Sequence, residues 1–403
     1  MDGLFPVIHQ RASFVSSIPK CGACGLDKGC CSPKMPVTGR GERGILVVAE
    51  SPGAEEDSSN TQLVGAAGQL LRERMWAVGI DLDRDCWKTN ALICRPPDNR
   101  TPTELEIEFC RPNLKNTIDA LKPRQIMPLG LVAAKSLLGP FWKDDSSFGS
   151  MGQWVGWEIP FQEWNAWVTP NYHPSYVLRS RDERDGPVVD VWFNRYLAAH
   201  ARTAGRPWDV VPNYGSEVQI IMDPDRAASW IRDRMQRPGP FSFDFETNCL
   251  KPESDGAEIV CCSICWNGRE TIAYPWVGEA MAATGEFIAS PVPKVGASDL
   301  EDRWSRRIFG HGVRNLVWDT TLGAHLLDNR KGIVSVKFQA FIRCGISDWS
   351  AAVKPYLRGD GGNGKNRIRE LDLRTLLKYC GIDSRVEYEI AVSQRKEFKN
   401  AAF

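Results

Sequence analysis

Four cysteines have the types and spacing of a metal site. Cys21 and Cys24 form a C-x2-C pair, and Cys94 and Cys110 follow much later, on either side of residues 95–100. A close pair that is joined by two distant cysteines can form a site with four thiolates. Such thiolates bind zinc or an iron–sulfur cluster. The pair alone would also suit a redox motif or half of a zinc site, and buried thiols without a function are common.

Polar side chains also follow the expected strands of the first half of the chain. An apolar run at residues 44–49 predicts a buried strand that ends in an acidic turn at residues 50–57. Residues 89–94 and 168–175 are expected to form two further strand ends. Ligands of open α/β sheets bind at the carboxyl ends of the strands, so we expect a pocket for a flat polar ligand there. Each strand end contributes one side chain to it: Glu50, Asn90 and His173.

In this region the chain resembles the iron–sulfur uracil-DNA glycosylases of the thermophile type. The resemblance covers about residues 15–200, and the motifs occur in the order of that family. After the C-x2-C pair come four more motifs: Glu50–Gly53, Val64–Leu71, Asn90–Arg100 with Cys110, and His173 with Pro174. The resemblance implies an open parallel sheet with helices on both faces. It also implies that Cys21, Cys24, Cys94 and Cys110 hold a [4Fe–4S] cluster, with zinc as the alternative.

The resemblance also implies roles for the three polar residues. Uracil has to be flipped out of the DNA stack before the glycosidic bond can break. Asn90 would read the edge of uracil and exclude cytosine, because its amide has both a donor and an acceptor. His173 would donate a hydrogen bond to the uracil carbonyl oxygen as negative charge develops on the leaving base. Glu50, with the backbone of the acidic turn, would orient the attacking water and shape the sugar pocket.

Three neighbouring residues are expected to contact the substrate: Ser51, Gly53 and Leu63. Leu63 differs from the family, which usually has an aromatic residue there that stacks on the flipped base. Such stacking contributes roughly 1–3 kcal/mol. Ser51 also differs, because alanine or glycine is usual at its position. The alternative interpretation of this half is therefore a catalytically inactive module that binds DNA or a partner.

In the second half, two carboxylates lie on one predicted strand. Residues 241–247 alternate apolar and acidic residues, which places Asp244 and Glu246 on the same face. Two such carboxylates repel each other unless a cation lies between them, and their oxygens suit magnesium or manganese. Tyr379 and Asp383 are expected on one face of a helix near the C-terminus.

From residue 215 to about residue 395 the chain resembles the proofreading 3′–5′ exonuclease domain of family-A DNA polymerases. The resemblance implies a ribonuclease-H-like fold. It also implies that Asp244, Glu246 and Asp383 hold two Mg²⁺ or Mn²⁺ ions. One ion would activate a water and the other would stabilise the leaving 3′ oxygen, while Tyr379 helps to hold that water.

The family has one more acid, in an Asn-x-Lys-aromatic-acid motif. The matching stretch is residues 298–302, Ser-Asp-Leu-Glu-Asp, where neither the asparagine nor the lysine is present. Glu301 is the predicted acid because it follows an apolar residue, and Asp302 is the second choice.

The composition is that of an ordinary globular protein: 403 residues, 42% hydrophobic and 25% charged. We expect two domains, residues 1–205 and 213–403. No apolar run reaches the roughly 20 residues of a membrane span, and no signal-peptide pattern is present, so the expected location is the cytoplasm of a bacterium or of a phage-infected host cell. The formal net charge is zero, so any affinity for DNA has to come from local basic clusters.

Together these features predict a DNA-processing enzyme that combines uracil excision with metal-dependent 3′–5′ exonuclease activity, similar to phage-type fusions. Because the chain ends just after the last exonuclease motif, a DNA polymerase on a separate chain is an expected partner. One alternative keeps the exonuclease and treats the first half as a binding module. Another is a replication scaffold in which neither site is active.

Overall fold

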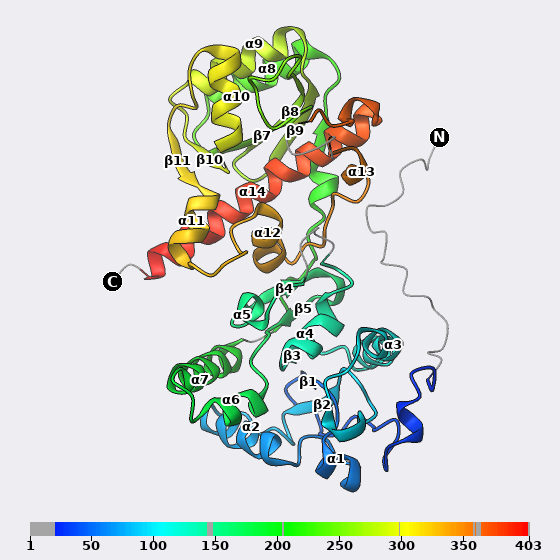
Figure 1. Ribbon diagram of the computed structural model, residues 1–403. Coiled ribbons are helices and arrows are strands. Elements are labelled where there is room, and N and C mark those ends of the chain that lie inside the picture. Colours follow the sequence, from blue (N-terminus) through cyan, green and yellow to red (C-terminus); the bar gives the residue numbers. More distant parts are fainter. Residues whose placement is uncertain are drawn as a thin grey trace. The chain divides into compact units, whose positions relative to one another are not determined.

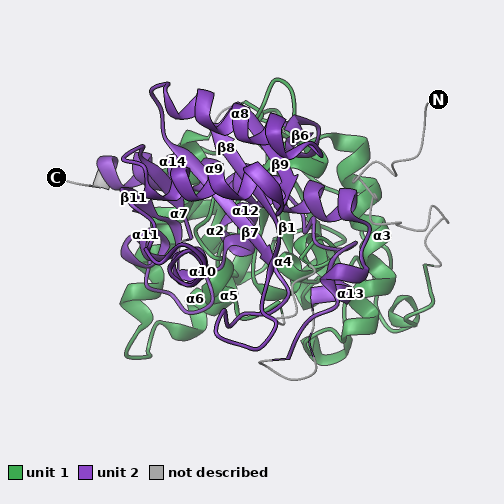
Figure 2. Ribbon diagram, turned by 90° about the horizontal axis from the view of Figure 1, so that it is seen from above, with its two compact units in different colours: residues 1–211 green, residues 212–403 purple. Residues whose placement is uncertain are grey.

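The computed structural model describes residues 21–142, 148–203, 205–297, 299–357, 359 and 364–401 (Figure 1). Ser298, the first residue of the expected acid motif, lies outside the described residues. The chain divides into two compact units, Met1–Val211 and Pro212–Phe403, which Figure 2 shows in green and purple.

In the first unit, strands alternate with helices. The strands are β1 (Ile45–Ala49), β2 (Cys86–Asn90), β3 (Gln125–Pro128), β4 (Ile159–Phe161) and β5 (Ala166–Val168). The helices are α1 (Ala54–Ser59), α2 (Ala66–Ala77), α3 (Glu104–Leu121), α4 (Leu131–Leu138), α5 (Met151–Trp154), α6 (Pro174–Ser180) and α7 (Gly186–Arg202). Three short 3₁₀ helices are η1 (Leu26–Lys28), η2 (Pro97–Asn99) and η3 (Gln162–Trp164).

The strands of the first unit form one sheet in the order β2-β1-β3-β5-β4. Strand β1 is parallel to β2 and β3, and β3 is parallel to β5. Ile45, Val47 and Ala49 pack into a core with residues of α2, α6 and α7. Leu46 and Val48, whose side chains leave the opposite face of β1, are fully buried as well. Both faces are therefore covered, and the expected parallel sheet with helices on both faces is confirmed.

Strand β4 is the exception, because it pairs antiparallel with β5. Only η3 and one further residue, Asn165, connect the two strands. A parallel pair would need a crossover of a dozen or more residues, so this short connection allows only the antiparallel arrangement.

The second unit contains a six-stranded sheet and seven α-helices within its described residues. The strands are β6 (Val218–Ile220), β7 (Phe241–Thr247), β8 (Ile259–Trp266), β9 (Glu270–Pro275), β10 (Lys294–Gly296) and β11 (Leu316–Asp319). The helices are α8 (Pro224–Met235), α9 (Gly278–Ala289), α10 (Asp299–Phe309), α11 (Thr320–Leu327), α12 (Val336–Cys344), α13 (Lys354–Leu357) and α14 (Leu373–Ala401). Two 3₁₀ helices are η4 (Tyr214–Glu217) and η5 (Ile368–Glu370).

The sheet of the second unit has the order β11-β10-β7-β8-β9-β6. Strand β7 is antiparallel to β8 and parallel to β10, so it lies in the middle of a mixed sheet. One core contains residues of β7, α8 and α9, and a second core contains residues of α12 and α14. In Figure 1 the long helix α14 runs across this sheet. A mixed sheet with Asp244 and Glu246 on a central strand agrees with the ribonuclease-H-like class expected from the sequence.

Among the described helices of both units, none combines the length and the apolar character that a bilayer crossing requires.

Candidate active sites

Four neighbouring parallel strands of the first unit end at one polar edge. In sheet order, Asn90 ends β2, Glu50 follows β1, Gly130 comes shortly after β3, and His173 lies beyond β5. The backbone fixes this alignment, because Ala49 is in register with Asn90 and Leu129 forms a bridge with Asn171. The structure therefore brings the three expected polar residues to the same edge.

Glu50 and His173 lie next to each other above Gly130. A Cβ atom on Gly130 would lie 2.4 Å from Glu50 Oε1 and 3.0 Å from Cβ of His173. The backbone of Gly130 also has a φ of +85°, a region that favours glycine. A side chain at position 130 would occupy the space beside Glu50 and His173, so glycine at this position leaves room for both residues.

The hydrogen bonds of His173 determine which ring nitrogen carries the proton. His173 precedes α6, and its Nδ1 accepts a hydrogen bond from the backbone N–H of Ser175 at 3.2 Å. Burial, followed by the positive charge of Arg179, lowers the pKa of His173 to about 4. A neutral imidazole with an accepting Nδ1 carries its proton on Nε2. His173 is thus a neutral hydrogen-bond donor.

The Glu50 carboxylate is largely shielded from solvent. Its Oε1 accepts a hydrogen bond from Val132 N at 3.4 Å. Burial raises the pKa of Glu50 above 4.5, although the Val132 bond and the charge of Arg179 oppose this shift. A carboxylate with a raised pKa is a better proton acceptor, which suits a group that orients or activates water.

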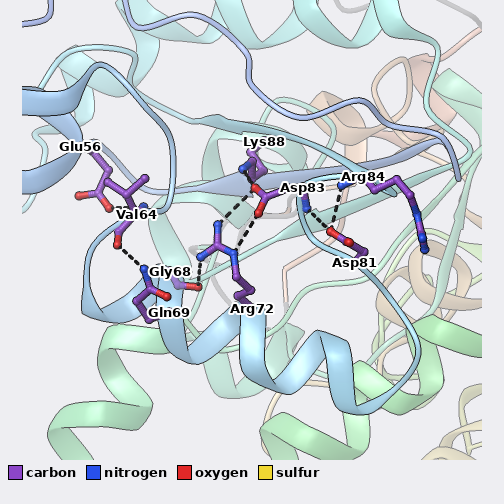
Figure 3. A network of polar contacts seen from close by, with 9 residues as sticks. All are labelled: Glu56, Val64, Gly68, Gln69, Arg72, Asp81, Asp83, Arg84 and Lys88. Carbon is purple, nitrogen blue, oxygen red and sulfur yellow. Dashed lines mark hydrogen bonds and ion pairs between the residues drawn. The ribbon is translucent and has the colours of Figure 1, made fainter.

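A short loop between α1 and α2 contacts this edge through Gln62, which bonds to Asn90, and Glu56 holds the loop in place. Glu56 Oε1 accepts hydrogen bonds from Val64 N at 2.9 Å and from Gly65 N at 2.7 Å. Gln69 Nε2 donates to Val64 O at 2.9 Å, and Arg72 connects α2 to Asp83 (Figure 3). Glu56 and Gln69 thus hold the loop between α1 and the start of α2, and Arg72 ties α2 to the segment that precedes β2.

Leu63 lies within this loop in a strained conformation. Its φ is +55°, which costs a non-glycine residue roughly 1–3 kcal/mol, and its side chain is only 6% exposed. The loop also passes close to α2, because a Cβ atom on Gly68 would lie 1.9 Å from Leu63 O. Glycine at position 68 is therefore needed for this contact.

The other two expected substrate contacts lie at the start of the acidic turn. Gly53 is the N-cap of α1, and its backbone N–H donates to Glu56 Oε2 at 3.2 Å. Ser51 is half-buried directly after Glu50. Asp57 connects this turn to the N-terminal cysteine segment, because its carboxylate accepts hydrogen bonds from Cys31 N and Ser32 N.

The four predicted ligand cysteines, Cys21, Cys24, Cys94 and Cys110, line one cavity. Cys94 and Cys110 are buried, and their sulfurs accept hydrogen bonds from Lys34 N at 3.3 Å and Ile93 N at 3.4 Å. Leu26, Ile93 and Phe109 provide apolar walls. Backbone N–H groups that point at sulfur stabilise negative thiolates, so the donor set fits a bound metal centre.

The spacing of the sulfurs can be compared with that of a zinc site. A tetrahedral zinc with Zn–S bonds of about 2.3 Å places its sulfurs roughly 3.8 Å apart. Within the described residues, three candidate ligand atoms lie within 4.8 Å of one another only at Asp244, Glu246 and Cys380. Among the described residues, no three of the four sulfurs therefore lie within 4.8 Å of one another.

The second unit gathers carboxylates around β7. Asp244 and Glu246 extend from one face of this strand, and Asp383 of α14 lies close enough for its charge to act on both. Burial, followed by the charge of Asp383, raises the pKa of Asp244 to about 7. Burial and the charge of Asp244 also raise the pKa of Glu246 well above its ordinary value. These groups lack a sufficient counter-charge, and carboxylate oxygens are the ligands that Mg²⁺ and Mn²⁺ prefer.

Lys337 on α12 provides a positive charge at this cluster. Its Nζ lies 3.2 Å from Asp383 Oδ1, to which Trp349 Nε1 also donates a hydrogen bond at 3.0 Å. The ammonium group lies 3.6 Å from the ring centre of Trp349 and 4.7 Å from that of Tyr379. Burial, followed by the charge of Asp383, raises the pKa of Tyr379, so its phenol keeps its proton.

The structure separates the two candidates for the fourth acid. Glu301 on α10 is 6% exposed, its Oε2 has no hydrogen-bond partner among the described residues, and its pKa is raised by burial and by the charge of Asp244. Asp302 instead accepts hydrogen bonds from Val313 N and from Arg306. Glu301 therefore lies near Asp244 with a buried oxygen that has no partner among the described residues, whereas Asp302 is engaged by Val313 and Arg306.

Four further residues at these sites were missed by the sequence analysis. They are Gln62 beside Asn90, and Lys337, Trp349 and Glu387 beside the carboxylates. Glu387 could have been recognised, because it lies one helical turn after Asp383 on α14 and follows the same spacing as Tyr379. The other three have no motif of their own.

A DNA polymerase of Bacillus phage SP01 is 33% identical to the chain over 108 residues, which are 26% of this chain and 12% of that protein. The solved structure of RNase D from Escherichia coli has 14% sequence identity and a TM-score of 0.35, and the match covers 46% of each chain.

The similarity of the first unit is much closer. Residues 36–196 match the Uracil DNA glycosylase superfamily. The type-4 uracil-DNA glycosylase of Pyrobaculum aerophilum is 40% identical over 165 residues, which are 40% of this chain and 81% of that protein. Such identity over most of the relative's length shows common descent. Through its first unit, the chain belongs to the type-4 uracil-DNA glycosylase family.

Proposed function

We propose that the first unit excises uracil from DNA by hydrolysis of the N-glycosidic bond. The observation that carries this proposal is the meeting of Asn90, Glu50 and His173 at one sheet edge in a chain of the type-4 family. Asn90 would bind the edge of the flipped base, since an amide offers a donor and an acceptor side by side. DNA is therefore the proposed substrate.

His173 would act on the leaving base. Its Nε2 proton can be donated to a uracil carbonyl oxygen on which negative charge develops, and a neutral donor of this kind needs no change of protonation during the reaction. Glu50, beside His173, would orient the attacking water and stabilise positive charge on the sugar.

The four cysteines would hold a [4Fe–4S] cluster, as is typical of type-4 enzymes. Bound there, the cluster would fix the cysteine segment as a structural element rather than take part in redox chemistry. Purification without oxygen, followed by iron and sulfide analysis, tests this assignment. Four irons and four sulfides for each chain would support it, and one zinc without iron would refute it.

The second unit would remove nucleotides from the 3′ end of DNA with two divalent cations. Asp244, Glu246, Asp383 and Glu301 would bind the cations, and Tyr379 would hold the attacking water with its phenol proton. Bound magnesium or manganese would supply a water of lowered pKa and neutralise charge on the leaving oxygen. A DNA polymerase is a proposed partner.

A second candidate function for the first unit is binding without catalysis, and Leu63 motivates it. The family usually has an aromatic residue at this position, whereas Leu63 is aliphatic, buried and unable to stack on a base. Single-turnover assays on single- and double-stranded oligonucleotides with one uracil separate the two candidates. Abasic product at excess enzyme supports the glycosylase, and tight binding without any product supports the binding module.

A further inference from the structure

The Asn90 amide is connected to a buried glutamine that comes from the loop between α1 and α2. Gln62 is 0% exposed, and its Oε1 accepts a hydrogen bond from Asn90 Nδ2 at 2.5 Å. At its other end, Gln62 Nε2 donates to the backbone carbonyl of Pro36 at 3.2 Å. These two bonds form a short relay from a backbone atom to the base-reading side chain.

The backbone end of the relay determines the orientation of both amides. A carbonyl oxygen can only accept, so the group of Gln62 that faces Pro36 has to be the NH₂. The oxygen of Gln62 then faces Asn90, and Asn90 in turn has to present its NH₂ to this oxygen. If the Asn90 amide turned over, two acceptor oxygens would meet in a buried place, which is unfavourable.

We propose that Gln62 is a positioning residue that sets base specificity, an inference that rests on the proposed uracil excision. With one Asn90 proton bound to Gln62, the other proton and Oδ1 remain for the base. This arrangement matches uracil, which offers O4 as an acceptor and N3–H as a donor. Cytosine offers the reverse pattern, an N4 donor and an N3 acceptor, and would need the turned amide.

The surroundings of the relay keep it in place. Pro36 follows a segment that is held at two points, because Met35 N donates to Ile93 O at 2.8 Å and Lys34 N donates to Cys94 Sγ at 3.3 Å. The loop that carries Gln62 is held by Glu56 through Val64 and Gly65. Both ends of the relay are thus fixed by contacts that do not involve Asn90.

The test compares excision of uracil and cytosine by the full chain. Gln62→Leu has nearly the same volume but no polar atoms, so Asn90 loses its partner and can turn. We expect the uracil-over-cytosine ratio of kcat/KM to fall about tenfold or more, the size of one lost buried hydrogen bond. Asn194→Leu is the control, since the Asn194 amide donates to Asp190 on α7 and contacts neither Asn90 nor the loop that carries Gln62. Its ratio should stay that of the parent.

A double-mutant cycle separates positioning from a general structural role. In an Asn90→Ala background, Gln62→Leu should change uracil excision less than twofold, because Gln62 acts through Asn90. An equal loss in both backgrounds would overturn the inference. If Gln62→Leu fails to fold, Gln62→Met replaces it. This variant also fills the space without an acceptor for Asn90 and should show the same fall in the uracil-over-cytosine ratio, so an unchanged ratio would contradict the relay.

Binding measurements keep this inference distinct from the proposed function. If the parent forms no abasic product, the proposed activity fails, and the relay is then tested with single-stranded DNA that carries 2′-fluoro-2′-deoxyuridine or 2′-fluoro-2′-deoxycytidine. The parent should bind the uracil strand more tightly, and Gln62→Leu should reduce this preference about tenfold. Equal binding of both strands by the parent would refute the inference.

Discussion

The polar edge of the first unit and the acidic cluster of the second unit use charge in opposite ways. At the first site, His173 is neutral, and hydrogen bonds determine which of its atoms donate and which accept. Asn90 is oriented in the same way by Gln62. At the second site, Asp244, Glu246 and Glu301 have raised pKa values because they are buried together.

This difference indicates which of the two proposed sites needs a bound cation. Fixed neutral donors are preorganised without a cofactor at the edge, so in the proposed function the first site would recognise a base without a bound cation. Buried carboxylates that repel one another are costly unless a cation binds between them. In the proposed function, the first site therefore depends on orientation, and the second depends on a divalent cation.

Removal of the cation should produce the largest difference between the two sites. EDTA, or Asp244→Asn in the presence of Mg²⁺, should slow shortening of a 5′-labelled strand by more than about 10³-fold, while uracil excision stays within a factor of two. Denaturing gels of both reactions with the same preparation measure this. Asp255→Asn, at an exposed carboxylate, is the control that should change neither reaction. Exonuclease activity that survives in EDTA would contradict the assignment of the acidic cluster.

Loss of the base-reading amide should produce the converse result. Asn90→Ala removes the group that holds the flipped base, and single-turnover uracil excision should fall by about 10²- to 10³-fold. Exonuclease activity should be unchanged. Asn194→Ala, which removes an amide from α7 of the same unit, should leave both activities intact. If Asn90→Ala excises uracil at the parent rate, the polar edge is not the active site.

The pH dependence should also differ between the sites. The pKa of His173 is lowered to about 4, so the imidazole stays neutral above about pH 5 and contributes no acid limb there. The pKa of Glu50 is raised above 4.5, so uracil excision should decline at low pH as Glu50 takes up a proton. Glu50→Gln should be slower and should lack this acid limb. A limb that persists in Glu50→Gln would assign the titration to another group.

At the acidic cluster, protons and metal compete for the same oxygens. The pKa of Asp244 is raised to about 7, so below this pH its protonated form has to lose a proton before a cation binds. The magnesium concentration for half-maximal exonuclease activity should therefore rise roughly tenfold for each pH unit below 7. Magnesium titrations at pH 6 and pH 8 measure this, and equal midpoints would contradict it.

Much of both sites could be predicted because their residues lie on regular elements. The alternation of residues 241–247 placed Asp244 and Glu246 on one face of a strand, and the observed strand β7 is Phe241–Thr247. Likewise, the apolar run at residues 44–49 predicted β1, whose end carries Glu50. Periodicity and the parallel arrangement of strands bring such residues together, whichever side chains lie in the loops.

Gln62 and Lys337 could not be predicted, for physical reasons. Gln62 reaches Asn90 only because the loop bends through positive φ angles at Asn60 and Leu63, and leucine gives no signal of this conformation. Lys337 meets Asp383 because α12 packs beside α14, a tertiary contact without a local pattern. The roles of both residues depend on packing rather than on a motif.

The smallest expected effect concerns Lys337, whose ammonium group forms an ion pair with Asp383. Without magnesium, Lys337→Met removes positive charge from carboxylates that already repel one another, and we expect the free energy of unfolding to fall by about 1–2 kcal/mol. With saturating magnesium the loss should be smaller, because the cation neutralises the same carboxylates and its binding stabilises the folded state. Urea unfolding of the full chain with and without magnesium measures both values.

Lys396→Met, at an exposed lysine of α14, should change neither free energy of unfolding. An equal loss in both conditions would mean that Lys337 acts through packing against Trp349 and Tyr379, and that its charge does not substitute for a metal.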